Sequence, residues 1–396
     1  MNAAPVYLQA LGLSCALGAD EAPVRAALFS AAPRPLPVSA LHSPGRPLPL
    51  GLAAVEPAPL PVDLPRPWAS RTNALVAQVL PALRAAVGTA IERFGPRRVA
   101  VVLGSSTAGV LEGEAAARQR QAGGDWPAGY HYGQQEMASP ARYAAWALGA
   151  EGPAYGISTA CSSGAKALAS AARLLRAGLA DAVVCGGADA LCGLTVAGFS
   201  ALESVSSRAC NPLSVHREGI NLGEGAALFL LTREPGPVRL AGWGETSDAH
   251  HMSAPDPTGR GAADAMRQAL ARAGVDAGVV DYINLHGTAT PHNDAMESQA
   301  VAGLFGLGVP VSSTKPLTGH TLAAAGALEA AFAWLSLVDN PGHALPPHWW
   351  DGARDPALPA LRVVAPGERA ARAPQWVLSN SFAFGGSNAT LLFARG

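Results

Sequence analysis

The chain has 396 residues, of which 49% are hydrophobic and 14% are charged. This length and apolar content allow two ordinary domains, or one large fused pair, with a sizeable core. The 28 Lys and Arg residues nearly balance the 29 Asp and Glu residues, which leaves a formal net charge of -1. Because no broad basic field is available, nucleic acid and acidic lipid are excluded as expected partners.

The cysteines and the N-terminus predict a cytoplasmic protein. The five cysteines are odd in number and scattered, which fits neither a disulfide framework nor a CxxC motif. No basic region precedes the first apolar stretch, and Asp20 and Glu21 follow too soon for a secretory leader. The apolar run 321–338 carries Glu329 at its centre, where a charge in lipid would cost roughly 2.5–3.5 kcal/mol. We expect a buried helix there and no membrane span.

In chain order, the first unusual segment is a proline-rich stretch. Residues 33–67 contain eleven prolines, a density that excludes regular helix and predicts an extended surface excursion. Beyond it, four short apolar runs end in Gly or Ser and precede Ala-rich stretches. These runs are residues 98–104, 181–187, 282–287 and 309–313. Buried strands that alternate with helices predict an α/β layered fold.

Two further patterns predict a helix and a boundary between two halves. Residues 165–179 carry apolar side chains at helical spacing, with Arg173 and Arg176 off the stripe, which predicts a helix that begins just after Cys161. The sequence Glu-Pro-Gly-Pro at 234–237 separates a strand-like run at 226–231 from a new one that starts at Val238. We therefore expect an N-terminal half, 1–237, and a C-terminal half, 238–396.

Cys161 lies at a predicted strand-to-helix transition, within residues 157–164. Backbone N–H groups at a helix N-terminus stabilise negative charge, so we expect the pKa of this thiol to lie below its free value of about 8.5. A nucleophilic thiolate is the functional interpretation. The alternative for a lone cysteine is a small buried apolar residue. We assign that role to Cys15, Cys185, Cys192 and Cys210.

Two histidines occupy positions suited to a cleft. His286 ends an apolar strand, where open α/β sheets place their ligands, although a purely structural histidine is the simple alternative. His320 directly precedes a helix of small residues, and each histidine neighbours a glycine that permits close backbone approach. One cysteine with two such histidines suggests a thiol ester site. The glycine turn at 380–388, taken alone, predicts only a tight hairpin.

Four segments together, in this order, resemble the β-ketoacyl-[acyl carrier protein] synthase family. They are 159–164 (TACSSG), 286–291 (HGTATP), 315–320 (KPLTGH) and 380–386 (NSFAFGG), and residues 221–226 and 248–255 are also similar. The resemblance implies a thiolase-like fold, a five-layer αβαβα sandwich built from two similar halves. It also implies a dimer, and a mobile loop at 248–255 near the acyl site.

The resemblance implies roles for single residues. Cys161 would be the nucleophile, and His286 and His320 would act as bases or hydrogen-bond donors. Supporting residues would be Lys315, Glu329, Thr288, Thr290 and Asp294, with Phe384 as a gate at the acyl pocket and as a backbone oxyanion donor. The implied reaction is a decarboxylative Claisen condensation of an acyl group on Cys161 with malonyl carrier protein. That reaction makes the chain a 3-oxoacyl-[acyl carrier protein] synthase.

The same resemblance implies partners and cofactors. The acyl carrier protein would bring substrates on its phosphopantetheine and dock on a local rim of arginines. The second protomer would be an identical chain or a ketosynthase-like chain-length partner. No resident cofactor is expected, because the chain lacks Walker and Rossmann patterns. No metal is expected either, because the pairs His250/His251 and His286/His292 lack the i,i+4 spacing of a zinc site.

Related classes differ at identifiable positions. A thiolase would need a second cysteine near the C-terminus, but none follows Cys210, and an initiating synthase would have Asn in place of His320. A chain-length partner subunit would lack the nucleophile, whereas Cys161 is present. Housekeeping fatty-acid elongation remains the main alternative.

Three features favour a specialised pathway over that alternative. The connection at 232–237 is short, the proline-rich stretch is unlike that of housekeeping enzymes, and residues 103–114 and 221–225 resemble synthases of aryl-polyene pigment clusters. We expect a straight pocket walled by small residues to select stiff conjugated chains by their shape.

Overall fold

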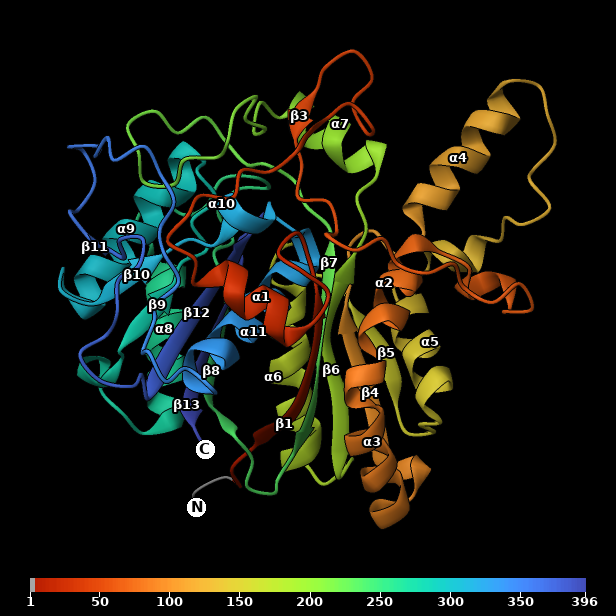
Figure 1. The fold of residues 1–396 in the computed structure, drawn as a ribbon, viewed down its shortest axis with the longest axis horizontal. Coiled ribbons are helices and arrows are strands. Elements are labelled where there is room, and N and C mark those ends of the chain that lie inside the picture. Colours follow the sequence, from red (N-terminus) through yellow and green to blue (C-terminus); the bar gives the residue numbers. More distant parts are fainter. Residues whose placement is uncertain (1–3) are drawn as a thin grey trace.

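The computed structural model describes residues 4–396 and contains two sets of strands (Figure 1). The first set is β1 (Tyr7–Ser14), β4 (Val99–Gly104), β5 (Ala154–Ile157), β6 (Ala182–Asp189) and β7 (Gly225–Thr232). The second set is β8 (Val238–Ser247), β9 (Tyr282–Asn284), β10 (Pro310–Ser312), β11 (Arg362–Val363), β12 (Trp376–Ala383) and β13 (Ser387–Arg395). They form one eleven-stranded sheet in the order β11-β10-β9-β12-β13-β8-β1-β7-β6-β4-β5. The sets meet where β1 pairs with β8 over two residue pairs.

The two halves repeat one topology. In the first half, β5, β4 and β6 are parallel neighbours, and β7 and β1 continue the sheet antiparallel. In the second half, β10, β9 and β12 are parallel neighbours, and β13 and β8 continue it antiparallel. The predicted runs at 98–104, 181–187, 282–287 and 309–313 supply the parallel strands β4, β6, β9 and β10. This duplication confirms two similar halves.

Each set of strands forms one β layer, and helices form the other three of the five layers. The central helices α6 (Ser163–Arg176) and α11 (Ala325–Leu337) contact strands of both halves. The first half is covered outside by α2 (Arg71–Val79), α3 (Pro81–Phe94) and α5 (Ser139–Leu148), and the second half by α8 (Arg260–Ala273) with α9 (Pro291–Phe305). Peripheral elements are α1 (Glu21–Leu28), β2 (Val38–Ser39), β3 (Leu48–Pro49), α4 (Val110–Gln121) and α7 (Gly193–Ala201). The short helix α10 (Lys315–Thr318) is buried. The expected αβαβα sandwich is confirmed.

The sequence predicted one central helix correctly and misplaced the end of the other. All of α11 is buried, including Glu329, so the prediction of a buried helix is confirmed. α6 begins at Ser163, close to the predicted start, but it ends at Arg176. Gly178 has a left-handed φ of 68°, which stops the helix before Leu179, whose side chain is 59% exposed. The prediction that the helix reaches residue 179 was therefore wrong.

The helices of the described chain are short or polar for a membrane span. Among residues 4–396, no single helix is both long enough and apolar enough to cross a membrane. The pair α2 and α3, bent by 69°, reaches the required length and composition only when the two helices are taken together. Both of these helices pack on strands of the first half.

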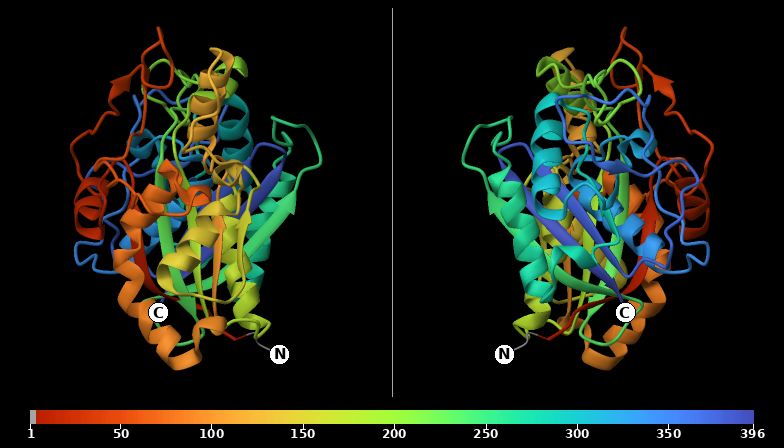
Figure 2. Two further views of the ribbon diagram at one scale, coloured as in Figure 1. Left: turned by 90° about the vertical axis from the view of Figure 1, so that its right-hand side faces the viewer. Right: turned by 90° about the vertical axis from the view of Figure 1, so that its left-hand side faces the viewer.

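The proline-rich stretch turns inward at its centre, which the sequence did not predict. Figure 2 shows this segment, in red, along one side of the molecule. Leu48 and Leu50 are fully buried and belong to an apolar cluster with Leu222 and Leu322. Most of the stretch is exposed, as expected of a surface excursion, but the burial of its centre was not predicted. Two leucines among prolines give no periodicity that would reveal a buried face.

Gly51 continues this inward path and joins the backbone beside His320. Its N–H donates to the Leu222 carbonyl over 2.8 Å, and the N–H of Gly223 donates to the carbonyl of His320 over 3.0 Å. A methyl group on Gly51 would lie 1.8 Å from the carbonyl oxygen of Thr318, so only glycine fits. The stretch thus packs directly against the segment that carries His320.

Candidate active site

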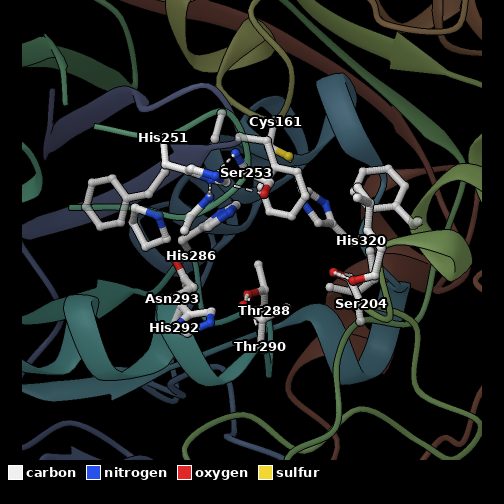
Figure 3. A pocket seen from close by; sticks show the side chains of 18 of the residues that line it. Cys161, Ser204, His251, Ser253, His286, Thr288, Thr290, His292, Asn293 and His320 are labelled. Atoms are coloured by element: carbon white, nitrogen blue, oxygen red, sulfur yellow. Dashed lines mark hydrogen bonds between the residues drawn. The ribbon is translucent and has the colours of Figure 1, made fainter. Parts of the chain in front are cut away.

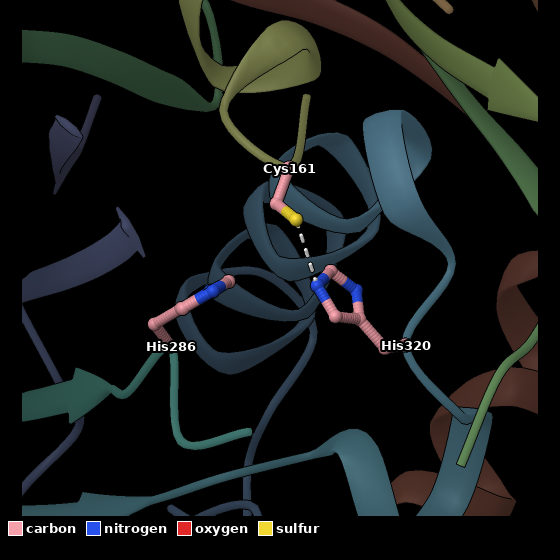
Figure 4. Close-up of side chains that lie close together, drawn as sticks. All are labelled: Cys161, His286 and His320. Carbon is pink, nitrogen blue, oxygen red and sulfur yellow. Dashed lines mark hydrogen bonds between the residues drawn. The ribbon is translucent and has the colours of Figure 1, made fainter. Parts of the chain in front are cut away.

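Three turns bring Cys161, His286 and His320 together between the halves (Figure 4). Cys161 lies between β5 and α6, His286 follows β9, and His320 follows α10. The His320 Nε2 atom is 3.0 Å from the Cys161 sulfur, and the two imidazole ring centroids are 5.4 Å apart. All three side chains are buried. The structure therefore assembles the cluster that the separate motifs predicted.

Each of the three residues has a neighbour with a left-handed backbone. Ala160 precedes Cys161 with a φ of 51°, Ala289 follows His286 with a φ of 64°, and Leu322 follows His320 with a φ of 52°. Such conformations cost a non-glycine residue on the order of 1–3 kcal/mol and concentrate at functional sites. These sharp turns aim the side chains at one point. Nothing in the identity of an alanine or leucine predicts this geometry.

The hydrogen bonds around the two imidazoles fix which nitrogen carries the proton. The N–H of Leu322 donates to His320 Nδ1 over 3.2 Å, so the proton of a neutral ring is assigned to Nε2. The Nδ1 atom of His286 lies 3.5 Å from Lys315 Nζ, which assigns its proton to Nε2 as well. Burial, and then the charge of Lys315, hold the pKa of both imidazoles well below the usual range. Both rings are therefore neutral and suited to donate, rather than to act as bases.

The acidity of Cys161 differs from the sequence-based expectation. Burial raises the pKa of its thiol to about 11, although the Lys315 charge and the backbone N–H of Phe384 oppose the shift. The expectation of a lowered pKa was wrong because it counted the helix N-terminus and not the loss of water around the sulfur. The resting protein holds a neutral thiol that accepts a hydrogen bond from His320.

We expect alkylation of Cys161 by iodoacetamide to be slow at neutral pH. A pKa of about 11 keeps the thiolate scarce, so the rate should rise about tenfold per pH unit between about pH 7 and pH 10 without a plateau. Peptide mass spectrometry at Cys161 measures the rate, and a free cysteine peptide serves as reference. A plateau below about pH 9 would restore the lowered pKa that the helix N-terminus predicts.

Lys315 and Glu329 form a buried ion pair next to His286. Lys315 Nζ lies 2.5 Å from Glu329 Oε1. Burial raises the pKa of Glu329 to about 7, and Lys315 opposes that shift. Glu329 thus keeps the Lys315 ammonium in place against the Nδ1 atom of His286, on the side away from Cys161.

The other predicted supporting residues shape the loop after His286. The carboxylate of Asp294 accepts hydrogen bonds from the N–H groups of Leu213, at 2.8 Å, and Ala289, at 3.2 Å. The hydroxyl groups of Thr288 and Thr290 lie 2.9 Å apart and line the pocket. Asp294 therefore anchors the backbone, whereas the two threonines face the space that a substrate would occupy.

Two buried carboxylates at the site were missed by sequence reasoning. Glu297 accepts hydrogen bonds from the N–H groups of His286 and Gly287, both at 2.8 Å, and burial raises its pKa to about 7. Its position one helical turn after Asp294 on α9 was the available signal. Asp189 accepts a hydrogen bond from the N–H of Ala323 at 2.8 Å. An acid at the end of the apolar run of β6 was the signal there.

A pocket of about 300 Å³ opens above the cluster (Figure 3). Its polar lining includes Thr288, Thr290 and His251, the last from the segment 248–255. The rings of Phe199 and Phe384 lie 5.6 Å apart on the same pocket. The expected wall of small residues was therefore wrong, because aromatic side chains from α7 and the β12–β13 turn fill that role. Phe384 does lie beside the pocket, as predicted.

The cluster also has the composition of a metal site. The ligand atoms of Cys161, His286 and His320 all lie within 4.8 Å of one another, and one sulfur with two imidazoles fits zinc. The spacing of the histidine pairs in the sequence did not predict this set. Lys315 close to His286 places a positive charge that opposes a bound cation.

Comparison with known proteins places the chain in one family. Models of the β-ketoacyl synthase N-terminal and C-terminal domains match residues 72–235 and 238–347. The 3-oxoacyl-[acyl-carrier-protein] synthase 2 of Staphylococcus aureus (strain COL) is 37% identical over 269 residues, which span 63% of each chain. The match thus covers less than two thirds of that relative's length.

Solved structures extend the similarity over nearly the whole chain. A chain of the complex between a ketosynthase (ApeO) and its chain length factor (ApeC) from Xenorhabdus doucetiae is 42% identical, with a TM-score of 0.90. The alignment covers 99% of this chain and 98% of that one. A β-ketoacyl synthase from Burkholderia phymatum STM815 is 30% identical, with full coverage of both chains and a TM-score of 0.84. With the sequence motifs and the buried cluster, these matches establish that the chain belongs to the β-ketoacyl synthase family of acyl-transferring condensing enzymes.

Proposed function

We propose that this protein is a 3-oxoacyl-[acyl carrier protein] synthase that joins an acyl group to a malonyl-derived unit. The observation that carries the proposal is the convergence of the Cys161 sulfur with the imidazoles of His286 and His320 under one pocket. A nucleophile for a thioester and two neutral donors for an enolate are the groups that this condensation needs.

In the first step, the Cys161 sulfur attacks the thioester carbonyl of an acyl carrier protein. The new bond joins the sulfur to the acyl carbon, the old carbon–sulfur bond breaks, and the thiol proton ends on the released phosphopantetheine thiol. The backbone N–H groups of Cys161 and Phe384 point at the reacting sulfur and would hold the intermediate oxyanion. The raised pKa of Cys161 fits this exchange, because no net charge is created.

In the second step, the bond between the malonyl carboxylate and the α-carbon breaks and CO2 leaves. The electron pair of that bond stays with the α-carbon and forms an enolate. The Nε2–H groups of His286 and His320 donate to the enolate oxygen. The enolate carbon then attacks the Cys161 thioester, the bond between the acyl carbon and the sulfur breaks, and the sulfur takes up one proton from water. The product is a 3-oxoacyl carrier protein. Lys315 and Glu329 hold His286 in its donating form and touch no substrate atom in this scheme.

The proposal includes the partners and location that the resemblance implied. The acyl carrier protein delivers both substrates, and no resident cofactor or metal takes part. The complex from Xenorhabdus doucetiae pairs a ketosynthase with a chain length factor. We infer the same kind of pairing here, with this chain as the catalytic member because it retains Cys161. A cytoplasmic location follows from its substrates and its free cysteines.

The inferred pathway is the synthesis of conjugated chains, as in aryl-polyene pigments. Support comes from the similarity of residues 103–114 and 221–225 to that subfamily, and from the pocket lining. A conjugated chain is flat and stiff, so it loses little conformational freedom when it packs along the pocket surface formed by the rings of Phe199 and Phe384. A flexible saturated chain gains less from the same surface.

We expect condensation to be about tenfold faster with a polyenoyl carrier protein than with a saturated one of equal length, a difference of about 1.4 kcal/mol in the barrier. The rates are measured by product mass spectrometry, with and without a candidate chain length factor. Equal or faster use of the saturated chain under both conditions would favour housekeeping fatty-acid elongation, which is the second candidate function.

A further inference from the structure

The chain uses lysine at only two positions. Of its 28 Lys and Arg residues, 26 are arginines, and the two lysines are Lys315 and Lys166. Lys315 lies beside His286, and Lys166 lies in the first turn of α6, the helix that follows Cys161. A lysine carries a compact charge on a flexible stem, whereas arginine presents a wide planar fork. Both lysines therefore lie next to segments that carry the catalytic cluster.

Lys166 begins a chain of hydrogen bonds between two loops. Its Nζ atom donates to the Ser387 hydroxyl over 2.6 Å, and that hydroxyl lies 3.0 Å from the Ser162 hydroxyl. The Ser162 hydroxyl donates in turn to the carbonyl oxygen of Thr159 over 2.8 Å. The chain therefore connects the start of β13 to the turn that presents Cys161.

These two loops carry the two backbone donors that face the reacting sulfur. One is the N–H of Cys161 itself, and the other is the N–H of Phe384 in the turn between β12 and β13. Gly385 and Gly386 follow Phe384 with positive φ values of 82° and 72°, so this turn lacks the stiffness of ordinary backbone. The position of the β12–β13 turn therefore depends on the contacts at its two ends.

The turn is anchored on both sides. On one side, its backbone pairs with the 248–252 segment: the N–H of Gly385 donates to the Met252 carbonyl, and the N–H of Asp248 donates to the Gly386 carbonyl, both over 2.9 Å. On the side that faces Cys161, the contact runs through Ser387 to Ser162 and Lys166. The spacing between the two donors therefore depends on this second anchor.

The charge of Lys166 is not used in an ion pair. In residues 4–396, no carboxylate lies within 4.0 Å of its Nζ atom, and the nearby Glu245 is already bound by Arg173. The side chain is half-buried, and burial lowers its pKa, with Glu245 opposing the shift. A half-buried cation whose hydrogen bond goes to a hydroxyl adds little stability. If packing were the only role of residue 166, an apolar side chain of the same length would stabilise the fold more than lysine does.

We propose that Lys166 is a positioning residue that sets the spacing between the Cys161 and Phe384 N–H donors through Ser387 and Ser162. This inference rests on the proposed function. Lys166 touches no reacting atom and acts only through the turn. Because both donors serve the oxyanion, the loss of Lys166 should slow acyl transfer to Cys161 more than it weakens carrier protein binding.

The test compares Lys166→Met, Lys166→Arg and Ser387→Ala in the full chain, with Arg176→Met on the same helix as the matched control. Removal of one oxyanion donor costs about 10²–10³ in rate, so a displaced donor should cost about tenfold. We expect Lys166→Met and Ser387→Ala each to slow single-turnover acylation of Cys161 about tenfold, with unchanged carrier protein affinity and melting temperature. Lys166→Arg should recover only part of the loss, because the guanidinium is too wide for the site.

The double variant Lys166→Met/Ser387→Ala distinguishes one shared chain of hydrogen bonds from two independent effects on the rate. If both residues act through one chain of hydrogen bonds, the double variant should be no slower than either single variant. Additive losses, or an acylation rate of Lys166→Met equal to that of Arg176→Met, would overturn the proposal. A wild-type protein that fails to acylate Cys161 at all would instead overturn the proposed function, so the two failures are distinguishable.

Discussion

Replacement of Cys161 with alanine is expected to abolish acyl transfer and condensation while the fold remains intact. The sulfur is the atom that would form the covalent intermediate, and loss of a nucleophile in other enzymes lowers the rate by a factor on the order of 10⁴ or more. The change removes one buried atom, so only a small cavity forms and the melting temperature should fall little. Intact-mass spectrometry of the acylated protein and quantification of the 3-oxoacyl product measure both steps.

The matched control is Cys192→Ala, which makes the same chemical change at a buried cysteine near the start of α7. This control should acylate and condense like the wild type. Residual condensation by Cys161→Ala above the uncatalysed background would eliminate the covalent mechanism, whatever the behaviour of the control.

Alanine at His286 or His320 is expected to remove malonyl decarboxylation while some acylation of Cys161 survives. Each variant deletes one of the two donors to the enolate, a loss worth about 10²–10³ in rate. Glutamine variants sharpen the test, because an amide keeps an N–H donor but cannot accept a proton as a base. If donation is the role, His286→Gln and His320→Gln should exceed the alanine variants. Release of CO2 from malonyl carrier protein is the measurement.

The same role predicts the pH dependence of decarboxylation. Because the pKa of both imidazoles lies well below the usual range, both rings stay neutral from about pH 6 to pH 8, and the rate should be flat across that window. An inflection near pH 6.5 that disappears in either alanine variant would identify a base and refute the donor assignment. Normal decarboxylation in both alanine variants would remove these histidines from the step altogether.

The sequence predicted the layers and the cluster well because both depend on local patterns. Apolar runs that end in glycine mark β4 and β6 directly, and Cys161, His286 and His320 each stand inside a recognisable motif. The supporting carboxylates were harder to find. Asp189 holds the backbone of Ala323 from 134 positions away, and no local pattern in the chain joins two such positions.

The errors at the catalytic cluster share one physical cause, which is the environment that forms only on folding. The thiol of Cys161 was expected to be acidic from its place at a helix start, but burial raises its pKa, and the residues around it come from β12, His320 and the 286–290 loop. The proton position on His286 depends on Lys315, 29 positions away, and the proton position on His320 depends on the N–H of Leu322, which reaches the ring through a turn with a positive φ. Composition and spacing contain no information about either.

The inward turn of the proline-rich stretch sets a limit on exchanging parts between related enzymes. The family model of the N-terminal domain begins its match at residue 72, so a chimera designed from that model would be joined there. Yet Gly51 pairs with Leu222 and fits against Thr318, so a chimera joined at residue 72 would place a foreign backbone beneath His320. Chimeras intended to change substrate choice therefore need a junction ahead of Leu48. Residues 48–71 then come from the same parent as the segment that carries His320.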